Sequence, residues 1–284
     1  MAIALKLPPG RRVMITRHLG RFSLALFALL LISRVGWGSP SHEQALLQAS
    51  GVPAGRVASY LVRVDRLAVE FVADDRTADT DQRVQALHAF LHRRVLRGSY
   101  LASASDVGVA LEGGPFNCVA GTILLGMLCE RCGLEATSMS TRGHVWCRIQ
   151  GKRGAIDIET TSRDWFVFVA RYRGVPTLQV SEAMAAHRRR VLAGRALGVR
   201  ELLVVLHFNR GVTRIRENRL PEAALANLQA VSLDAECQPA WENLTAVRRN
   251  LPAFRGDSLG LDSRLIYWAI DEAANERQPK LAGR

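Results

Sequence analysis

The chain has few of the features that mark nucleic-acid-binding proteins. Its 284 residues carry a formal net charge of +12, but six of these charges lie in residues 1–38, which contain no acidic residue. The remainder is therefore only modestly basic, as many globular proteins are. The basic run Arg188–Arg190 has no aromatic platform or groove-entering motif beside it. We expect no nucleic-acid partner, and we interpret this run as the solvated face of a connecting helix.

A long hydrophobic run is also missing from the N-terminal leader. Its apolar segment, Phe22–Ile32, has eleven residues, whereas a membrane-spanning helix needs about 20. Basic residues precede this segment, and the small residues Gly36 and Gly38 follow it, which is the pattern of a secretory signal. We expect export to a periplasmic or extracytoplasmic location, with cleavage before Ser39. An uncleaved leader would instead tether the protein to the membrane through residues 22–32.

Metal-ligand clusters are scarce as well. Cys129 and Cys132 form a C-x-x-C motif, but no second pair follows at the spacing of a structural zinc site. His88 and His92 lie four residues apart on an expected helix, without an acidic or third ligand. The sequence therefore predicts no metal and no cofactor. The odd number of cysteines leaves at least one thiol free, and Cys147 could pair with either Cys129 or Cys132.

The most informative segment is 117–161, which begins with a cysteine. After the chain break at Glu112–Pro115, Cys118 opens an almost wholly apolar run that extends to Leu128 and is typical of a buried helix. Unpaired backbone N–H groups and the helix dipole stabilise a thiolate in the first helical turn and supply a donor to an oxyanion. Cys118 is thus the candidate nucleophile and the candidate free cysteine. The alternative is a buried cysteine that only packs.

Three β-like segments follow this helix, at 134–139, 144–149 and 155–161. Gln150–Gly154 connects the last two as a hairpin.

Polar residues share one face of this hairpin. Alternation along a strand places His144, Trp146 and Arg148 on one side, and Asp157 and Glu159 on the corresponding side of the next strand. Depending on the register, either acid can lie beside His144 and orient its imidazole. The alternative is a cross-strand salt bridge between Arg148 and Asp157 on a solvated face.

These three motifs together resemble the transglutaminase-like superfamily of papain-type fold. The likeness covers roughly residues 50–170 and lies in the order of a helix-initiating Cys118, a His144-Val-Trp146 strand and a strand end that reads Ile-Asp-Ile-Glu-Thr-Thr. It implies an α+β fold in which the helix bearing the cysteine packs on a small antiparallel sheet. It also implies Cys118 as nucleophile and His144 as general base. For the third residue, Glu159 keeps the following threonine of the family pattern, and Asp157 keeps the residue type; we favour Glu159.

A second, helical unit is expected in the C-terminal part. Asn209 and Asn243 are 34 residues apart, which is the tetratricopeptide period, and small residues at Gly211, Ala223 and Ala230 fall where two helices of such a repeat pack closely. An isolated repeat cannot bury its apolar face, so we expect it to dock on the catalytic domain or on Leu259–Ile270.

The expected organisation therefore has five parts. They are a leader (1–38), a transglutaminase-like domain (39–180), a basic linker helix (181–200), a tetratricopeptide-like helical region (201–272) and a flexible tail (273–284).

The resemblance implies a thiol enzyme that hydrolyses peptide or isopeptide bonds through an acyl-enzyme on Cys118. Its substrate would be a protein or peptide, and the helical region could hold a further protein partner. The alternative is a catalytically idle scaffold in which both units bind a partner protein.

Overall fold

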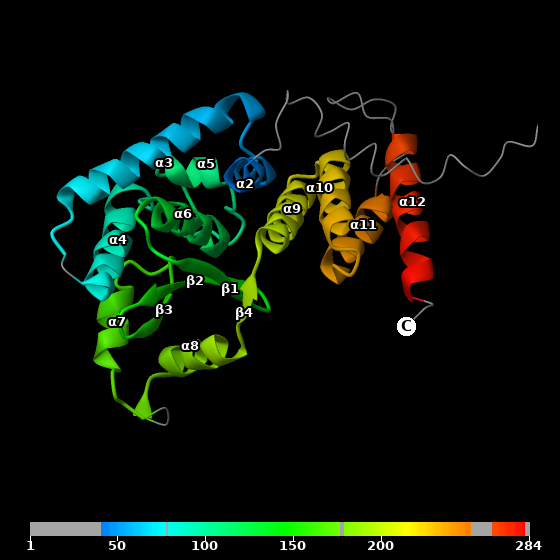
Figure 1. The fold of residues 1–284 in the computed structure, drawn as a ribbon. Helices are drawn as coiled ribbons and strands as arrows, with labels where there is room; N and C mark the ends of the chain where they lie inside the picture. Colours follow the sequence, from blue (N-terminus) through cyan, green and yellow to red (C-terminus); the bar gives the residue numbers. More distant parts are fainter. Residues whose placement is uncertain (1–40, 78, 177–178, 251–262, 282–284) are drawn as a thin grey trace, which may run out of the picture. The chain divides into compact units, whose positions relative to one another are not determined.

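The computed structural model describes residues 41–77, 79–176, 179–250 and 263–281, so the expected leader lies outside the described residues. The chain has an α+β fold with one small antiparallel sheet (Figure 1). No helix within the described ranges is long and apolar enough to cross a membrane. The elements are α2 (His42–Ser50), α3 (Ala54–Asp74), α4 (Thr80–Arg94), α5 (Val107–Leu111), α6 (Cys118–Arg131), β1 (Ala136–Thr141), β2 (His144–Gly151), β3 (Gly154–Ile158), α7 (Trp165–Arg171), α8 (Glu182–Ala193), β4 (Arg195–Leu197), α9 (Val199–Arg216), α10 (Leu220–Leu233), α11 (Gln238–Asn250) and α12 (Ser263–Leu281).

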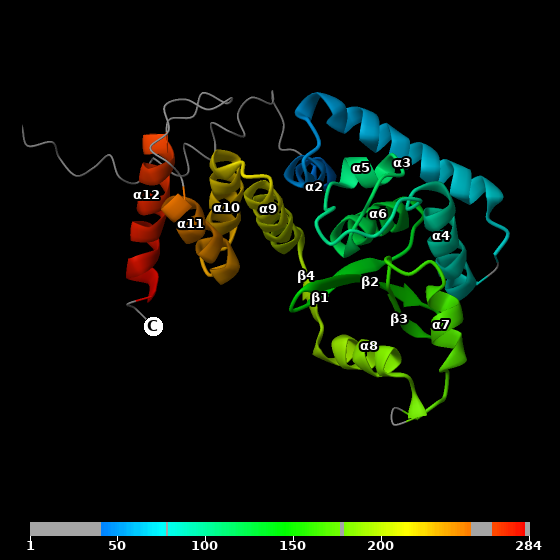
Figure 2. The same ribbon diagram turned by 180° about the vertical axis from the view of Figure 1, so that it is seen from behind.

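The sheet has the strand order β3-β2-β1-β4, with antiparallel pairing throughout. A tight turn joins β1 to β2, and Gly143 supplies the positive φ of 80° that this turn requires. The strand expected at 155–161 is shorter than predicted, because β3 ends at Ile158 and Glu159 follows it. β4 was not predicted. It lies within the expected linker 181–200 and pairs with β1, so part of this segment belongs to the sheet (Figure 2).

Helices cover both faces of the sheet (Figures 1 and 2). On one face, Val145, Cys147 and Ile149 of β2 are buried against α6 in the main core, as strand alternation dictates. On the other face, Trp146 is buried beneath the end of α8. A Cβ added to Gly194 would stand 2.4 Å from the Trp146 ring. α6, which carries Cys118, therefore packs on one face of the sheet, and α8 covers the other face.

The N-terminal helices hold this arrangement from outside. Tyr60, Val64 and Leu67 are among the buried residues of α3, and they follow the helical spacing seen in the sequence. Asp79 caps α4, because its carboxylate accepts from the backbone of Asp81. The side chain of Asp81 instead accepts from Lys152 N and from Arg153, both at 2.7 Å. It thereby ties α4 to the β2–β3 hairpin.

The C-terminal helices pack in sequence, with α9 against α10, α10 against α11, and both α10 and α11 against α12. Ala223 and Ala230 are fully buried, and a Cβ on Gly211 would stand 2.1 Å from the Asn227 amide, so these small residues permit the close approach that was expected. α9 also contacts α2 and α6. The segment expected to be a tail from residue 273 is part of α12, which is helical as far as Leu281.

Candidate active site

Cys118 is the first residue of α6. The preceding Asn117 caps this helix, since its Oδ1 accepts from the N–H groups of Val119 and Ala120, both at 3.0 Å. Its Nδ2 donates to Ala102 O at 3.0 Å and so fixes the loop before α5. With these two N–H groups taken, the N–H of Cys118 is the first-turn donor available to an oxyanion. The Cys118 side chain is largely buried, with 8% of the residue exposed.

His144 begins β2 and lies between Cys118 and Glu159. Its Nε2 lies 2.7 Å from Glu159 Oε2 and 2.9 Å from Oε1, so both carboxylate oxygens are within hydrogen-bond distance of this ring nitrogen. Burial lowers the pKa of His144, but hydrogen bonds to Cys118 and Glu159 outweigh burial and raise this pKa to about 9. Because Nε2 is engaged by Glu159, Nδ1 is the nitrogen left for the thiol. The three side chains therefore form a Cys–His–Glu row.

Glu159 is held in its ionised form. Burial raises its pKa, but His144, His187 and Arg190 oppose burial and lower the pKa to about 2. With the pKa of His144 at about 9, the pair is imidazolium and carboxylate at neutral pH. An imidazolium in contact with a thiol favours the thiolate, which is the nucleophilic form.

Asp157, the other candidate for the third residue, does not contact His144. The register places it opposite Arg148, and its carboxylate accepts from Arg148 Nε at 2.9 Å and from Trp146 Nε1 at 2.7 Å. The cross-strand salt bridge considered as the alternative is therefore present. Trp146 in turn stacks near the His144 ring, with centroids 6.1 Å apart and planes 15° apart. Asp157 thus fixes the tryptophan that lies beside the imidazole.

Arg190 of the basic run and the neighbouring His187 reach the site, which was not predicted from the sequence. His187 Nδ1 lies 3.8 Å, and Arg190 Nη2 3.6 Å, from Glu159 Oε1. Arg188 donates to the carbonyls of Tyr172 and Val175. The interpretation of this run as a solvated face holds for Arg189, which is exposed, and in part for Arg190, whose side chain is 40% exposed. The spacing of His187 and Arg190, three residues apart on a helix, was the signal that could have revealed a shared inward face.

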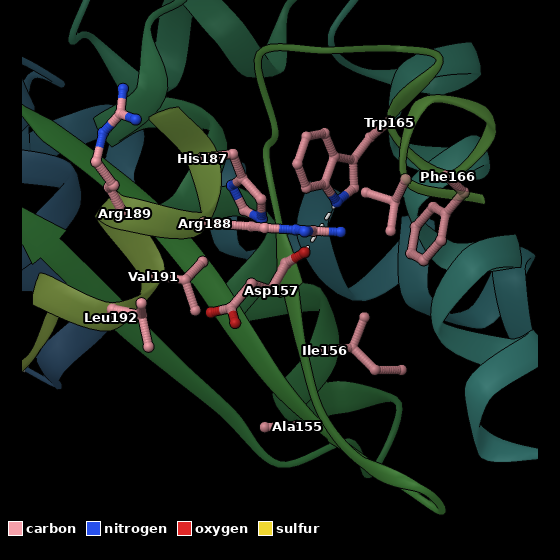
Figure 3. Close-up of a pocket in the computed structure, with 11 residues that line it drawn as sticks. Ala155, Ile156, Asp157, Trp165, Phe166, His187, Arg188, Arg189, Val191 and Leu192 are labelled. Atoms are coloured by element: carbon pink, nitrogen blue, oxygen red, sulfur yellow. Dashed lines mark hydrogen bonds between the residues drawn. The ribbon is translucent and has the colours of Figure 1, made fainter. Parts of the chain in front are cut away.

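A cavity of about 480 Å³ adjoins these residues, between β3, α7 and α8 (Figure 3). Ile156, Phe166 and Val191 give it an apolar lining, and His187 forms part of its wall. Trp165 donates to the backbone oxygen of Asp157 at 2.8 Å, and the ring of His187 packs edge-on against Trp165. Arg189 points away from the other lining residues (Figure 3).

The other cysteines and histidines form no second site among the described residues. His88 and His92 are buried with their rings 4.6 Å apart, and burial lowers the pKa of each to about 4. No group of three metal-ligating side chains occurs in the part of the chain that the structure describes. All five cysteines are free thiols; the hydrogen bond to Cys147, then burial, raises the pKa of Cys129.

Comparison of the chain with protein-family models, with curated protein sequences and with solved structures gave no match. Its function therefore has to be inferred from the geometry of the site.

Proposed function

We propose that the protein is an exported thiol amidohydrolase of transglutaminase-like type, which cleaves peptide or isopeptide bonds. The observation that carries this proposal is the row Cys118–His144–Glu159. A cysteine at a helix start contacts an imidazole whose Nε2 lies 2.7 Å from a buried carboxylate. This is the arrangement that thiol catalysis needs, with a nucleophile, a base and a group that orients the base. The α6 helix packed on the antiparallel sheet is consistent with a papain-type core.

The site residues can carry out both half-reactions. The Cys118 thiolate attacks the amide carbonyl, and the Cys118 N–H stabilises the resulting oxyanion. The His144 imidazolium then protonates the leaving amine, so the carbon–nitrogen bond breaks and a thioester remains on Cys118. In the second step neutral His144 takes a proton from water, which attacks the thioester and releases the acid. Cys118 leaves as thiolate, and His144 is again imidazolium.

The C-terminal helices would form a tetratricopeptide-like unit in this proposal. The close contact of Gly211 with Asn227 and the burial of Ala223 and Ala230 support it. Since α9 also packs on α2 and α6, the unit would brace the catalytic domain as well as offering a surface to a protein partner.

Labelling with iodoacetamide across pH tests the thiol site. We expect the peptide containing Cys118 to react at neutral pH, because the imidazolium of His144 favours the thiolate. In His144→Ala the reaction near pH 7 should slow markedly, because the imidazolium is lost. Cys237→Ala is the matched control, since Cys237 is another free, half-buried cysteine.

Turnover is then measured on fluorogenic peptide and isopeptide amides with the wild type and Cys118→Ala. If labelling is the same in the wild type and His144→Ala, and no amide is cleaved, the proposed enzyme activity is wrong. The alternative of a catalytically idle scaffold that binds a partner protein would then stand.

A further inference from the structure

Glu159 faces basic side chains on two sides. His144 of β2 lies on one side, and His187 and Arg190 of α8 lie on the other, at 3.8 and 3.6 Å from Oε1. The Glu159 side chain is only 7% exposed, whereas the Arg190 side chain is 40% exposed, so solvent screens the guanidinium in part. The two α8 contacts are longer than hydrogen bonds, and their effect on the carboxylate is therefore electrostatic.

Among the described residues, the acid within 4 Å of both His187 and Arg190 is Glu159. His187 Nδ1 and Arg190 Nε are buried atoms without a hydrogen-bond partner among the described residues. Burying unpartnered polar atoms costs free energy, so a site that keeps them needs a compensating interaction. Glu159 can supply this interaction, as an ion pair with Arg190 and through the polar ring atom of His187.

α8 is also fixed in its position relative to the site. Arg188 donates to Tyr172 O at 3.2 Å and Val175 O at 2.9 Å, which ties α8 to the end of α7. The His187 ring packs on Trp165 at 4.6 Å between centroids. At the other end of the helix, Gly194 lies against Trp146. The approach of His187 and Arg190 to Glu159 thus follows from the packing of the helix.

We propose that Arg190 and His187 are positioning residues of the thiol site, which hold the Glu159 carboxylate charged and oriented toward His144. This inference rests on the proposed function, and both residues act through Glu159.

Arg190 has a particular part in this arrangement because its guanidinium does not titrate. When His144 gives its proton to the leaving amine, it no longer compensates the buried charge of Glu159. Arg190 remains cationic through this step and keeps the carboxylate paired. The carboxylate is then ready to stabilise the imidazolium that forms again in the second half-reaction.

The direction of the Glu159 pKa agrees with this role. Burial raises it, whereas His144, His187 and Arg190 together lower it to about 2. One further titratable group faces the site: burial, with the charges of Cys118 and Glu159, raises the pKa of the Tyr100 phenol. Tyr100 is therefore neutral at the pH of the tests below.

Arg190→Ala, Arg190→Lys and, as matched control, Arg189→Ala test the proposal in the full chain. Arg189 neighbours Arg190 on α8, and its side chain is exposed. We expect Arg190→Ala to raise the Glu159 pKa, so that the acid limb of Cys118 labelling moves to higher pH. Labelling should fall most at the acidic end of the profile, where Glu159 of the variant takes up a proton and Glu159 of the wild type does not. Lysine should restore most of the rate, and Arg189→Ala should match the wild type.

Carbon-13 NMR of the Glu159 carboxyl gives a readout that is independent of thiol chemistry. The Glu159 carboxyl should begin to protonate at higher pH in Arg190→Ala than in Arg189→Ala. His187→Ala provides a second variant if Arg190→Ala does not fold, and it should shift Glu159 in the same direction. Identical Glu159 titrations and labelling profiles in the Arg190 and Arg189 variants would overturn the proposal. The Glu159 pKa could instead shift in Arg190→Ala while the labelling of Cys118 does not depend on His144. That result would contradict the proposed thiol enzyme but not the role of Arg190 toward Glu159.

Discussion

At the scale of single residues, the site depends on one choice that the sequence left open. Cys118 and His144 could be selected from sequence because a helix start and a His-x-Trp strand are local patterns. The third residue could not, because Asp157 and Glu159 share a strand face and only the register separates them. In the structure β3 ends at Ile158, and the free chain after it carries Glu159 to His144 Nε2. Asp157 remains paired with Arg148.

Glu159→Gln should therefore separate the two acids. Glutamine keeps the shape of the side chain but removes its charge, so the pKa of His144 should fall from about 9 toward the ordinary value of 6.5. The labelling of Cys118 near pH 7 should drop by about tenfold or more, because the imidazolium is lost. Asp157→Asn is the control and should keep the His144 titration, which NMR of labelled histidine measures. A normal profile in Glu159→Gln together with a shifted one in Asp157→Asn would reverse the assignment.

At the scale of elements, local periodicity predicted α6 well and α8 poorly. The apolar run from Val119 to Leu128 is buried almost throughout, so its composition alone identifies it as a core helix. The run at Arg188–Arg190 looks solvated by composition. Its contacts with Tyr172, Val175 and Glu159 arise only when α8 packs across the sheet. β4 was missed for a similar reason, since three residues carry too little pattern to predict a strand.

Two glycines of α6 provide a matched test of how closely this helix approaches the site. A Cβ on Gly121 would stand 2.6 Å from Thr160 Oγ1 and 2.9 Å from its Cβ, whereas a Cβ on Gly126 would meet nothing within 4 Å. Gly121→Ala should destabilise the fold by about 1–3 kcal/mol through overpacking. Gly126→Ala should stabilise it by up to about 1 kcal/mol through helix propensity. Urea unfolding measures both, and equal effects would contradict the close contact of α6 with Thr160.

At the scale of the whole molecule, buried histidines should govern the response to acid. Burial lowers the pKa of His88, His92 and His207 to about 4 each, and these residues lie on two different helices, α4 and α9. A group with a depressed folded-state pKa stabilises the fold above its unfolded pKa of about 6.5 and loses that stability as pH falls through the folded value. His144 acts in the opposite sense: its contribution is present below about 6.5 and is lost as pH rises through about 9.

The free energy of unfolding should therefore fall by several kcal/mol between about pH 6.5 and 4, since each pKa unit corresponds to about 1.4 kcal/mol. Urea titrations at fixed pH steps measure this slope. His88→Gln keeps a polar side chain but cannot protonate, so its unfolding free energy should fall less steeply over the same interval. His42→Gln is the control, because His42 is exposed at the start of α2, and its slope should match the wild type. A His88→Gln slope identical to that of His42→Gln would show that His88 takes up its proton without cost, and that the core around α4 opens before acid reaches it.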